Sequence, residues 1–430
     1  MRILVVGGGG REHALVWALK HDLPEATLFT APGNPGTAQL GTNLDIPATA
    51  VEHLVDAVRA QRIDVTIIGP EAPLSLGLAD RLRAGGRHVF GPNQAAAQIE
   101  SSKAFAKDVM AKAGVPTAKS RTFRSLTDAR DYIDRHPEPL VVKASGLAAG
   151  KGVVICATRA EAQRAAQTML EELAFGDAGR EIVVEDYLEG EELSVLALTD
   201  GERMVILPPA QDHKRLLDHD TGPNTGGMGA YCPVSLSTPR LLERVRREVF
   251  EPTLRELASR GMPYRGVLYA GLMLGAGGAI NVLEFNCRFG DPETQAVLPV
   301  LPAGSLAHLP AIAGGNWRPG RTVLPAVGSA VCTVLVARGY PDTPETGAAI
   351  TIPQDPGGGD DVLIFHAGTC ADRDGTIRVA GGRVLGVTGL ARSVPAAAKK
   401  SVAAAERIAF AGKAYRRDIG WREIARAGAA

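Results

Sequence analysis

Residues 281–295 read NVLEFNCRFGDPETQ, a short apolar strand that runs into a polar turn. Glu284 and Asn286 lie two positions apart in this strand, and because side chains alternate across a strand, both point to one face. A carboxylate and an amide oxygen on one face form a hard-oxygen pair suited to Mg²⁺. Arg288 follows the same alternation and adds a positive charge. We therefore predict a metal site of the kind that supports phosphoryl transfer, with a solvated strand edge as the simpler alternative.

The composition is that of an ordinary globular protein. Its 430 residues predict about three domains. Lys+Arg and Asp+Glu both number 47, and this balance argues against a nucleic-acid or membrane-surface partner. The longest uncharged apolar stretch, residues 266–280, is shorter than the about 20 residues that span a bilayer. The five cysteines form no CxxC pair, which predicts reduced cysteines in a cytoplasmic protein.

The first hundred residues alternate between strand and helix patterns. Strands are expected at 3–6, 26–30, 65–68 and 88–90. Helices between them predict an open parallel sheet. Each strand ends in glycine or proline, and in such sheets ligands bind at the carboxyl ends of the strands.

The remaining pattern changes twice along the chain. A helix over 102–113 is followed by a smaller α+β segment, and past residue 315 the pattern is mostly β, closed by an alanine-rich helix at 394–410. We expect an N-terminal α/β substrate-binding domain over 1–102 and a two-lobed central domain over 103–312. The smaller lid lobe of the centre covers 118–192, and a small, mostly-β α+β domain covers 313–430.

A glycine run, Gly7 to Gly10, follows the first strand and opens a helix. Backbone N–H groups at such a helix start can hold a phosphate. A dinucleotide fold fails here because Glu12 takes the third glycine position and no acidic residue ends the second strand. Arg11 can bind phosphate and Glu12 can accept from a hydroxyl or amine, which favours a phosphosugar over a ligand-free turn.

A second glycine loop, KASGLAAGKG at 143–152, is not a P-loop. Three residues separate Gly146 from Gly150, and neither Ser nor Thr follows Lys151. Two strands joined by a glycine loop with a lysine make a flap that can close over a triphosphate. A plain hairpin loop is the alternative.

Two further segments are unusually polar. In VVEDYLEGEE, residues 183–192, the turn backbone can hold an adenine edge and Glu192 can accept from ribose hydroxyls. The loop from QDHKR (211–215) to DTGPNTGGMGAY (220–231) has many glycines and few apolar anchors. Ordering such a loop without a ligand is costly, so we predict a functional loop.

These segments in this order resemble the ATP-grasp superfamily. GGREHA, APGN, GPEAPL, FHAGT and GGRV together with RFGDPETQ resemble, from Met1 to about Trp421, the family of ligases that join glycine to 5-phosphoribosylamine. That resemblance implies formation of glycinamide ribonucleotide in purine biosynthesis, through glycyl phosphate, with ATP cleaved to ADP and phosphate. It also implies Mg²⁺ or Mn²⁺, small-molecule substrates only, and a cytoplasmic monomer.

The resemblance also implies roles for individual residues. The residues that the resemblance implies in ATP binding are Lys103, Lys143, Gly146, Ala149, Gly150, Gly152, Glu185, Leu188 and Glu192. Substrate binding falls to Gly9, Gly10, Arg11, Glu12, Asn34, Glu71, Lys214, Asn224, Gly226 and Gly227. Glu284 and Asn286 bind the metal, and the catalytic set is Arg288, Lys151, Asp212 and Asp291. Arg288 steadies the acyl phosphate, while Asp212 and Asp291 orient an amine or accept its proton.

The sequence departs from the family pattern at three positions. Ser145 stands where Asp is usual, His219 replaces a small residue, and Cys232 replaces Ser. The strand before Glu284 reads YAGLML and carries no second metal carboxylate, so ATP phosphates must supply more of the ligands. The alternatives are another ATP-grasp ligase or carboxylase, which would need bicarbonate, and a non-catalytic nucleotide-binding sensor.

Overall fold

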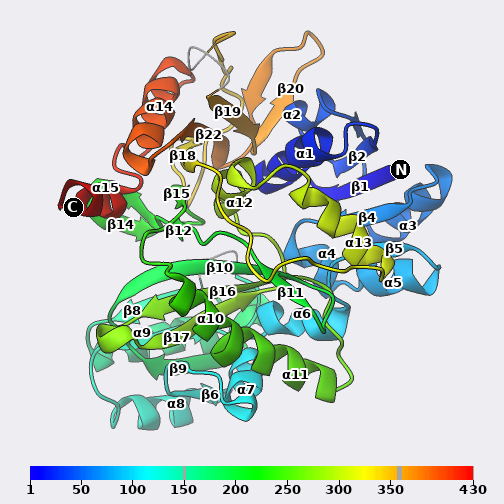
Figure 1. Ribbon diagram of the computed structural model, residues 1–430. Coiled ribbons are helices and arrows are strands. Elements are labelled where there is room, and N and C mark those ends of the chain that lie inside the picture. The colour runs from blue at the N-terminus through cyan, green and yellow to red at the C-terminus, as the bar shows by residue number, and fades with distance from the viewer. Residues whose placement is uncertain (149–151, 356–360, 430) are drawn as a thin grey trace.

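The computed structural model describes residues 1–148, 152–355 and 361–429 (Figure 1). Its N-terminal part is a five-stranded parallel sheet in the order β3-β2-β1-β4-β5. The strands are β1 (Arg2–Gly7), β2 (Thr27–Pro32), β3 (Thr42–Asn43), β4 (Val65–Ile68) and β5 (His88–Phe90). The predicted open parallel sheet is confirmed. Of the strands in this sheet, β3 was not predicted, because a two-residue polar edge strand has no hydrophobic pattern.

Helices connect these strands and bury one face against the sheet. They are α1 (Gly10–Asp22), α2 (Pro35–Ala38), α3 (Val51–Ala60), α4 (Glu71–Ser75), α5 (Leu78–Ala84) and α6 (Gln94–Ser101). The predicted helix that follows is α7 (Lys103–Ala113). The Ser102 hydroxyl accepts from the N–H of Phe105 at its start, and Gly114 ends it in a left-handed conformation at φ 67°.

The central part contains two antiparallel sheets of four strands each. The lid sheet, in the order β6-β9-β7-β8, is built from β6 (Ser120–Phe123), β7 (Leu140–Ala144), β8 (Val153–Cys156) and β9 (Ile182–Asp186). It packs with α8 (Leu126–Ile133) and α9 (Arg159–Leu170) around a hydrophobic core of its own. The other sheet, β11-β10-β16-β17, is built from β10 (Glu191–Thr199), β11 (Met204–Ile206), β16 (Gly266–Leu274) and β17 (Ile280–Asn286).

The strand that carries the predicted metal pair is β17. Opposite Gly271 of β16 lies Glu284, whereas the next residue of β16, Leu272, pairs with Val282. This register shift is a bulge at Leu283, and bulges often re-aim side chains at functional sites. Glu284 and Asn286 remain on one side of the strand and both line the cavity described below.

The C-terminal part is a five-stranded antiparallel sheet, β12-β15-β18-β22-β19. Its strands are β12 (Gln211–Asp212), β15 (Gly229–Cys232), β18 (Ser329–Val336), β19 (Val362–His366) and β22 (Arg383–Ala391). The expectation that 211–231 forms only a loop is wrong. Its ends are β12 and β15, and between them β13 (Arg215–Leu217) pairs with β14 (Thr221–Asn224). The pairing partner of β15 is β18, nearly a hundred residues later, so no local pattern marks these strands.

The remaining elements cover the sheets. They are α10 (Pro239–Val245), α11 (Glu251–Ser259), α12 (Glu293–Val297), α13 (His308–Gly314), α14 (Val394–Arg407), α15 (Trp421–Ala429), β20 (Thr369–Ala371) and β21 (Ile377–Val379). In Figure 1 the N-terminal and C-terminal sheets lie above the strands β10 and β16, and the lid strands β6 and β9 lie below them.

One large hydrophobic core runs from the N-terminal sheet into the central and C-terminal sheets. The predicted boundaries at residues 102, 312 and 118–192 stay predictions. Within the described chain, no single helix is long and apolar enough to cross a membrane. The helical segments Glu293–Val300 and Ser305–Gly314 meet that test only as a pair bent by 112°.

Candidate active site

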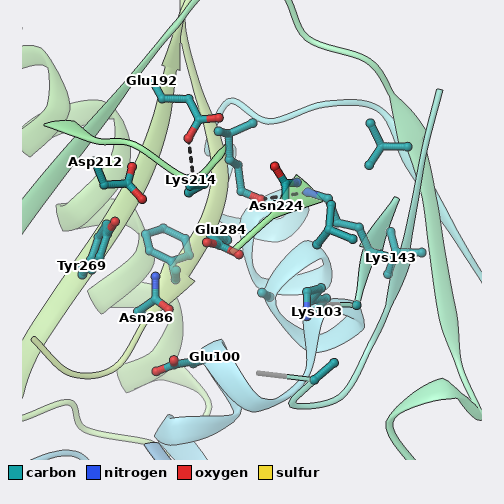
Figure 2. Close-up of a pocket in the computed structure, with 18 of the residues that line it drawn as sticks. Glu100, Lys103, Lys143, Glu192, Asp212, Lys214, Asn224, Tyr269, Glu284 and Asn286 are labelled. Carbon is teal, nitrogen blue, oxygen red and sulfur yellow. Dashed lines mark hydrogen bonds and ion pairs between the residues drawn. The ribbon is translucent and has the colours of Figure 1, made fainter. Parts of the chain in front are cut away.

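A cavity of about 450 Å³ lies where the N-terminal, central and C-terminal parts meet. Figure 2 labels charged and amide side chains of this cavity from α6, α7, the lid, β10, the 211–224 segment and β17, together with Tyr269 of β16. The N-terminal part contributes Arg11, Glu71 and Glu100, and the C-terminal part contributes Arg383. A ligand in this cavity would therefore contact segments that are far apart in the sequence.

Most of the predicted site residues line this cavity. They are Arg11, Glu71, Lys103, Lys143, Gly152, Glu185, Leu188, Glu192, Asp212, Lys214, Asn224, Gly226, Glu284, Asn286, Arg288 and Asp291. The predicted residues Gly9, Gly10, Glu12, Asn34, Gly146 and Gly227 are not in its lining. Ala149, Gly150 and Lys151 lie outside the described residues. The ligand that each residue binds stays a prediction.

Glu284 lies among the positive charges of the cavity, and Figure 2 shows it near the middle of the labelled side chains. Burial by itself raises the pKa of Glu284, but Lys214, Lys103, Lys143 and Arg288 hold it below its ordinary value. The carboxylate is therefore ionised at neutral pH. It is a competent metal ligand before any ligand binds.

Asn286 supplies the second oxygen, and its Oδ1 accepts from Nη2 of Arg288 at 3.1 Å. Among the described residues, no group of three His, Cys, Asp or Glu side chains forms a metal cluster. Two hard oxygens fit a Mg²⁺ or Mn²⁺ ion that takes its other ligands from phosphates and water. The residues present therefore fit the predicted metal, with few protein ligands.

Two of the lysines that line the cavity share one buried carboxylate. Glu185 is 2 % exposed and forms ion pairs with Lys143 and, at 2.5 Å, with Lys107. Lys143 Nζ also donates to the Leu283 carbonyl at 3.3 Å. The side chain of Glu185 is therefore engaged by two lysines, and its backbone lies within the lid sheet between Ser120 of β6 and Val141 of β7.

Lys107 was not predicted as a site residue. It lies one helical turn after Lys103 on α7, and residues four apart share a face of a helix. Burial lowers the pKa values of both lysines, against the pull of the nearby carboxylates. The i, i+4 spacing was the signal that could have found it.

The structure joins two residues that were predicted for different ligands. Lys214 Nζ lies 2.5 Å from Glu192 Oε2, and Figure 2 marks this contact. Burial alone lowers the pKa of Lys214, but Asp212, Glu192 and Glu284 raise it well above its ordinary value. A nucleotide that used Glu192 would have to share it with Lys214.

Asp212 lies near a hydrogen-bonded group that sequence reasoning missed. Burial raises the pKa of Asp212 to about 7, with Glu293 and Glu192 adding to the rise and Lys214 opposing it. Tyr269 Oη donates to Glu293 Oε1 at 2.5 Å and lies 2.8 Å from Ser194 Oγ. A carboxylate that titrates near neutral pH can accept a proton from an ammonium group, as predicted for Asp212.

Arg288 connects the metal pair to the N-terminal part. Its guanidinium lies 2.8 Å from Glu100 Oε1 and 3.3 Å from Glu71 Oε2. Glu100 also accepts from the N–H of Cys287 at 2.7 Å. Arg288 is therefore held in one orientation beside Asn286.

Two predicted substrate residues use their hydrogen bonds to support the fold. Glu12 accepts from the N–H of Gly9, the residue before α1, at 2.8 Å and from Nε of Arg11 at 2.6 Å. The Asn34 side chain caps α2 and donates to the carbonyls of Gly8 and His366. Both side chains hold the loops that border the cavity.

The predicted glycines near the cavity allow close packing. A Cβ on Gly10 would come within 2.6 Å of Gln295 Nε2. Gly227 has φ +110° and a Cβ there would meet Pro292 at 2.5 Å. These glycines let the 7–12 and 224–229 loops approach the RFGDPETQ segment.

Comparison with known proteins places this geometry in a family. The chain matches the models of phosphoribosylglycinamide synthetase for the N domain at residues 1–100, the ATP-grasp (A) domain at 101–294 and the C domain at 330–422. It is 46% identical to phosphoribosylamine–glycine ligase of Ralstonia nicotianae, over 99% of this chain and 100% of the relative. It is 44% identical to the enzyme of that name from Neisseria meningitidis serogroup A, over 99% and 100%.

Solved structures agree with this assignment. Phosphoribosylamine–glycine ligase from Thermotoga maritima superposes with a TM-score of 0.85 at 37% identity, covering 97% of this chain and 100% of that one. The biotin carboxylase domain of Hydrogenobacter thermophilus 2-oxoglutarate carboxylase has a TM-score of 0.73 at 16% identity, covering 96% and 91%, and shares the fold alone. The chain belongs to the phosphoribosylglycinamide synthetase family of ATP-grasp enzymes.

Proposed function

We propose that this chain joins glycine to 5-phosphoribosylamine, with ATP as co-substrate, to give glycinamide ribonucleotide, ADP and phosphate. Full-length relatives at 44–46% identity that bear the name phosphoribosylamine–glycine ligase support this activity. The observation that carries it is the single cavity in which the Glu284–Asn286 pair, Lys103, Lys143 and Arg11 all meet. Nucleotide, metal and phosphosugar groups can lie side by side there.

The chemistry requires an activated carboxylate, because a free carboxylate has no adequate leaving group. An oxygen of the glycine carboxylate attacks the γ-phosphorus of ATP, the bond to the β–γ bridging oxygen breaks, and ADP leaves. The glycyl phosphate then reacts with the ribosylamine nitrogen. A bond forms between this nitrogen and the acyl carbon, phosphate leaves with the electron pair of the C–O bond, and the nitrogen loses a proton.

The residues of the cavity suit these steps. Lys103, Lys143 and Arg288 can offset the negative charge of the transferring group. A divalent metal held by Glu284 and Asn286 would supply further charge neutralisation on the phosphates. Asp212 can accept the released proton, because burial has brought its pKa to about 7.

We also propose that the protein works as a monomer in the cytoplasm with Mg²⁺ or Mn²⁺. The five cysteines are free, and four are buried. This usage is typical of a reducing compartment.

The test is ADP release from ATP and Mg²⁺ with glycine and freshly made phosphoribosylamine, omitting one substrate at a time. We expect ADP release only with both acceptors, and a product that contains the glycyl amide. Bicarbonate-dependent ADP release without glycine would instead indicate a carboxylase. ATP binding without turnover would indicate a nucleotide sensor.

A further inference from the structure

Arg383 is the one described residue beyond position 312 that lines the cavity. It begins β22 within the GGRV segment, and no role was predicted for it. Its side chain is 25% exposed, so most of the guanidinium is shielded from solvent. An arginine carried from the C-terminal sheet into a substrate cavity needs a chemical explanation.

Half of this guanidinium is committed to neighbouring loops. Nη1 donates to the Gly226 carbonyl at 2.6 Å and to the Asp291 carbonyl at 2.8 Å. A Cβ on Gly226 would approach Arg383 Cζ to 3.2 Å, so glycine gives the guanidinium room. Nε and Nη2 form no hydrogen bond with any residue that the structure describes, which leaves three N–H groups for a ligand.

A second guanidinium that lines the cavity, that of Arg11, contacts the same 289–291 turn from the N-terminal part. Arg11 donates from Nε to Glu12 and, at 3.0 Å, from Nη1 to the Phe289 carbonyl. Its Nη2 also lacks a hydrogen bond within the described chain, although its side chain is only 8% exposed. Arg11 and Arg383 thus donate to carbonyls only two residues apart, those of Phe289 and Asp291. Burial by itself raises the pKa of the Asp291 carboxyl group, but Arg383 and Arg11 both lower it.

Two arginines with unused donors form a site for an oxyanion with several acceptor oxygens. A phosphate monoester has three such oxygens, and the planar guanidinium matches them in pairs. Under the proposed function, the sugar 5′-phosphate is the one phosphate monoester that enters with the acceptor substrate. The neighbouring Asp291 carboxylate lies 3.4 Å from Nη1 and so faces the committed half of Arg383.

We propose that Arg383, together with Arg11, binds the 5′-phosphate of phosphoribosylamine and makes the enzyme select the phosphorylated sugar. This inference rests on the proposed function. It gives the C-terminal part a direct role in substrate recognition. Arg383 is a specificity-determining residue here and takes no part in the bond changes.

The test compares Arg383→Gln and Arg383→Lys with a matched control, Arg378→Gln. Arg378 lies on the neighbouring strand β21, pairs with the exposed Asp372, and does not line the cavity. For each variant, kcat/KM is measured at saturating ATP and glycine for the amine made from ribose 5-phosphate and ammonia. It is then measured for the amine made from ribose and ammonia. Calorimetric titration with ribose 5-phosphate, with inorganic phosphate and with ribose gives the affinities without turnover.

We expect Arg383→Gln to lower the preference for the phosphorylated amine by at least about 10-fold, the loss of one charge-assisted hydrogen bond. Arg383→Lys should retain part of that preference, and the KM values for ATP and glycine should stay near those of the wild type. Ribose 5-phosphate affinity should fall in parallel, whereas ribose affinity should not change.

An equal loss of kcat/KM for the phosphorylated and the unphosphorylated amine would overturn the inference and leave Arg383 as a structural support of the 224–229 loop. A rise confined to the KM for ATP would overturn it in favour of a nucleotide phosphate. If the wild-type protein bound ribose 5-phosphate through Arg383 but ligated no glycine, the proposed function would fail while the phosphate site stood. If Arg383→Gln ligated glycine with an unchanged preference, the phosphate site would fail while the proposed function stood.

Discussion

Four cations converge on Glu284, and this shapes the electrostatics of the cavity. Lys214, Lys103, Lys143 and Arg288 all lower the pKa of its carboxyl group. In the ligand-free protein two of these lysines, Lys143 and Lys214, also contact Glu185 and Glu192. Under the proposed function, nucleotide binding would exchange internal ion pairs for contacts with phosphate oxygens.

Glu284→Gln should abolish ligation while the protein still folds. The substitution removes the ionised metal ligand and keeps the side-chain shape, so ADP release should fall at least about 100-fold. Circular dichroism should match that of the wild type. The control is Glu202→Gln, at an exposed surface position. Wild-type turnover in Glu284→Gln would refute the metal assignment.

Asp212 makes stability depend on pH with a defined sign. Its pKa rises from 3.8 to about 7 on folding, so between these values the folded protein binds more protons than the unfolded chain. The contribution of Asp212 to the free energy of unfolding therefore falls as pH rises from about 4 to about 7 and then levels off.

Asp212→Asn should remove the fall in the free energy of unfolding that ionisation of Asp212 causes. The Tm of the variant minus that of the wild type should grow between pH 4 and pH 7, reaching a few degrees, and stay constant above. The exposed residue Asp56 provides a control as Asp56→Asn, whose Tm difference should be flat. A flat profile for Asp212→Asn would show that the carboxyl is ionised throughout.

Sequence reasoning found the residues whose chemistry follows from local spacing. Glu284, Asn286 and Arg288 follow strand alternation, and all three line the cavity. It missed Arg383 because the Gly226 carbonyl that fixes it is 157 residues away. The substrate role of Asn34 stays a prediction, and a one-dimensional pattern could not show that this side chain also caps α2 and donates to the His366 carbonyl of β19.

At the scale of elements, a cluster of family motifs joins the N-terminal and C-terminal sheets. Asn34 from APGN caps α2 and donates to the His366 carbonyl of FHAGT at 2.9 Å. His13 from GGREHA accepts from the N–H of His366 at 2.8 Å. Burial lowers the pKa values of His13 and His366 to about 3 and about 4, so both are neutral at pH 7. These motifs hold loops in place beside the cavity.

Asn34→Ala should therefore destabilise the fold. Loss of a helix cap and of two hydrogen bonds to carbonyls should lower the free energy of unfolding by about 2 kcal/mol or more. Asn93→Ala is the matched control, because the Asn93 side chain caps α6 by accepting a single hydrogen bond, from the N–H of Ala96. Denaturant titration compares them. A different outcome is that the two variants lose the same free energy of unfolding while only Asn34→Ala raises the KM for the amine. That outcome would favour the predicted substrate role of Asn34.

The strands that were predictable have local signals. The alternation of apolar strands with helices gave β1, β2, β4 and β5, and the mostly β pattern past residue 315 agrees with β18. β12 and β15 have two and four residues and exist because β18 and each other supply their hydrogen bonds. Their backbone conformation is a tertiary effect that periodicity within the segment does not encode.

On the scale of the whole molecule, one cavity is assembled from three parts that share a continuous core. The N-terminal sheet brings Arg11 and Glu71 to its carboxyl edge, the central sheets bring the lysines and the metal pair, and the C-terminal sheet brings Arg383. The lid sheet packs around a separate core beside the cavity. This arrangement suits a reaction that must exclude water from an acyl phosphate.

The central claim is that a metal at Glu284 and Asn286 holds the phosphates of ATP. A crystal of the protein with a non-hydrolysable ATP analogue and Mn²⁺, measured for anomalous scattering, tests it most directly. We predict an anomalous peak within coordination distance of the Glu284 carboxylate and Asn286 Oδ1, bridged to the triphosphate, with Lys103 and Lys143 on the phosphate oxygens. A peak and a triphosphate bound away from these residues would contradict the account.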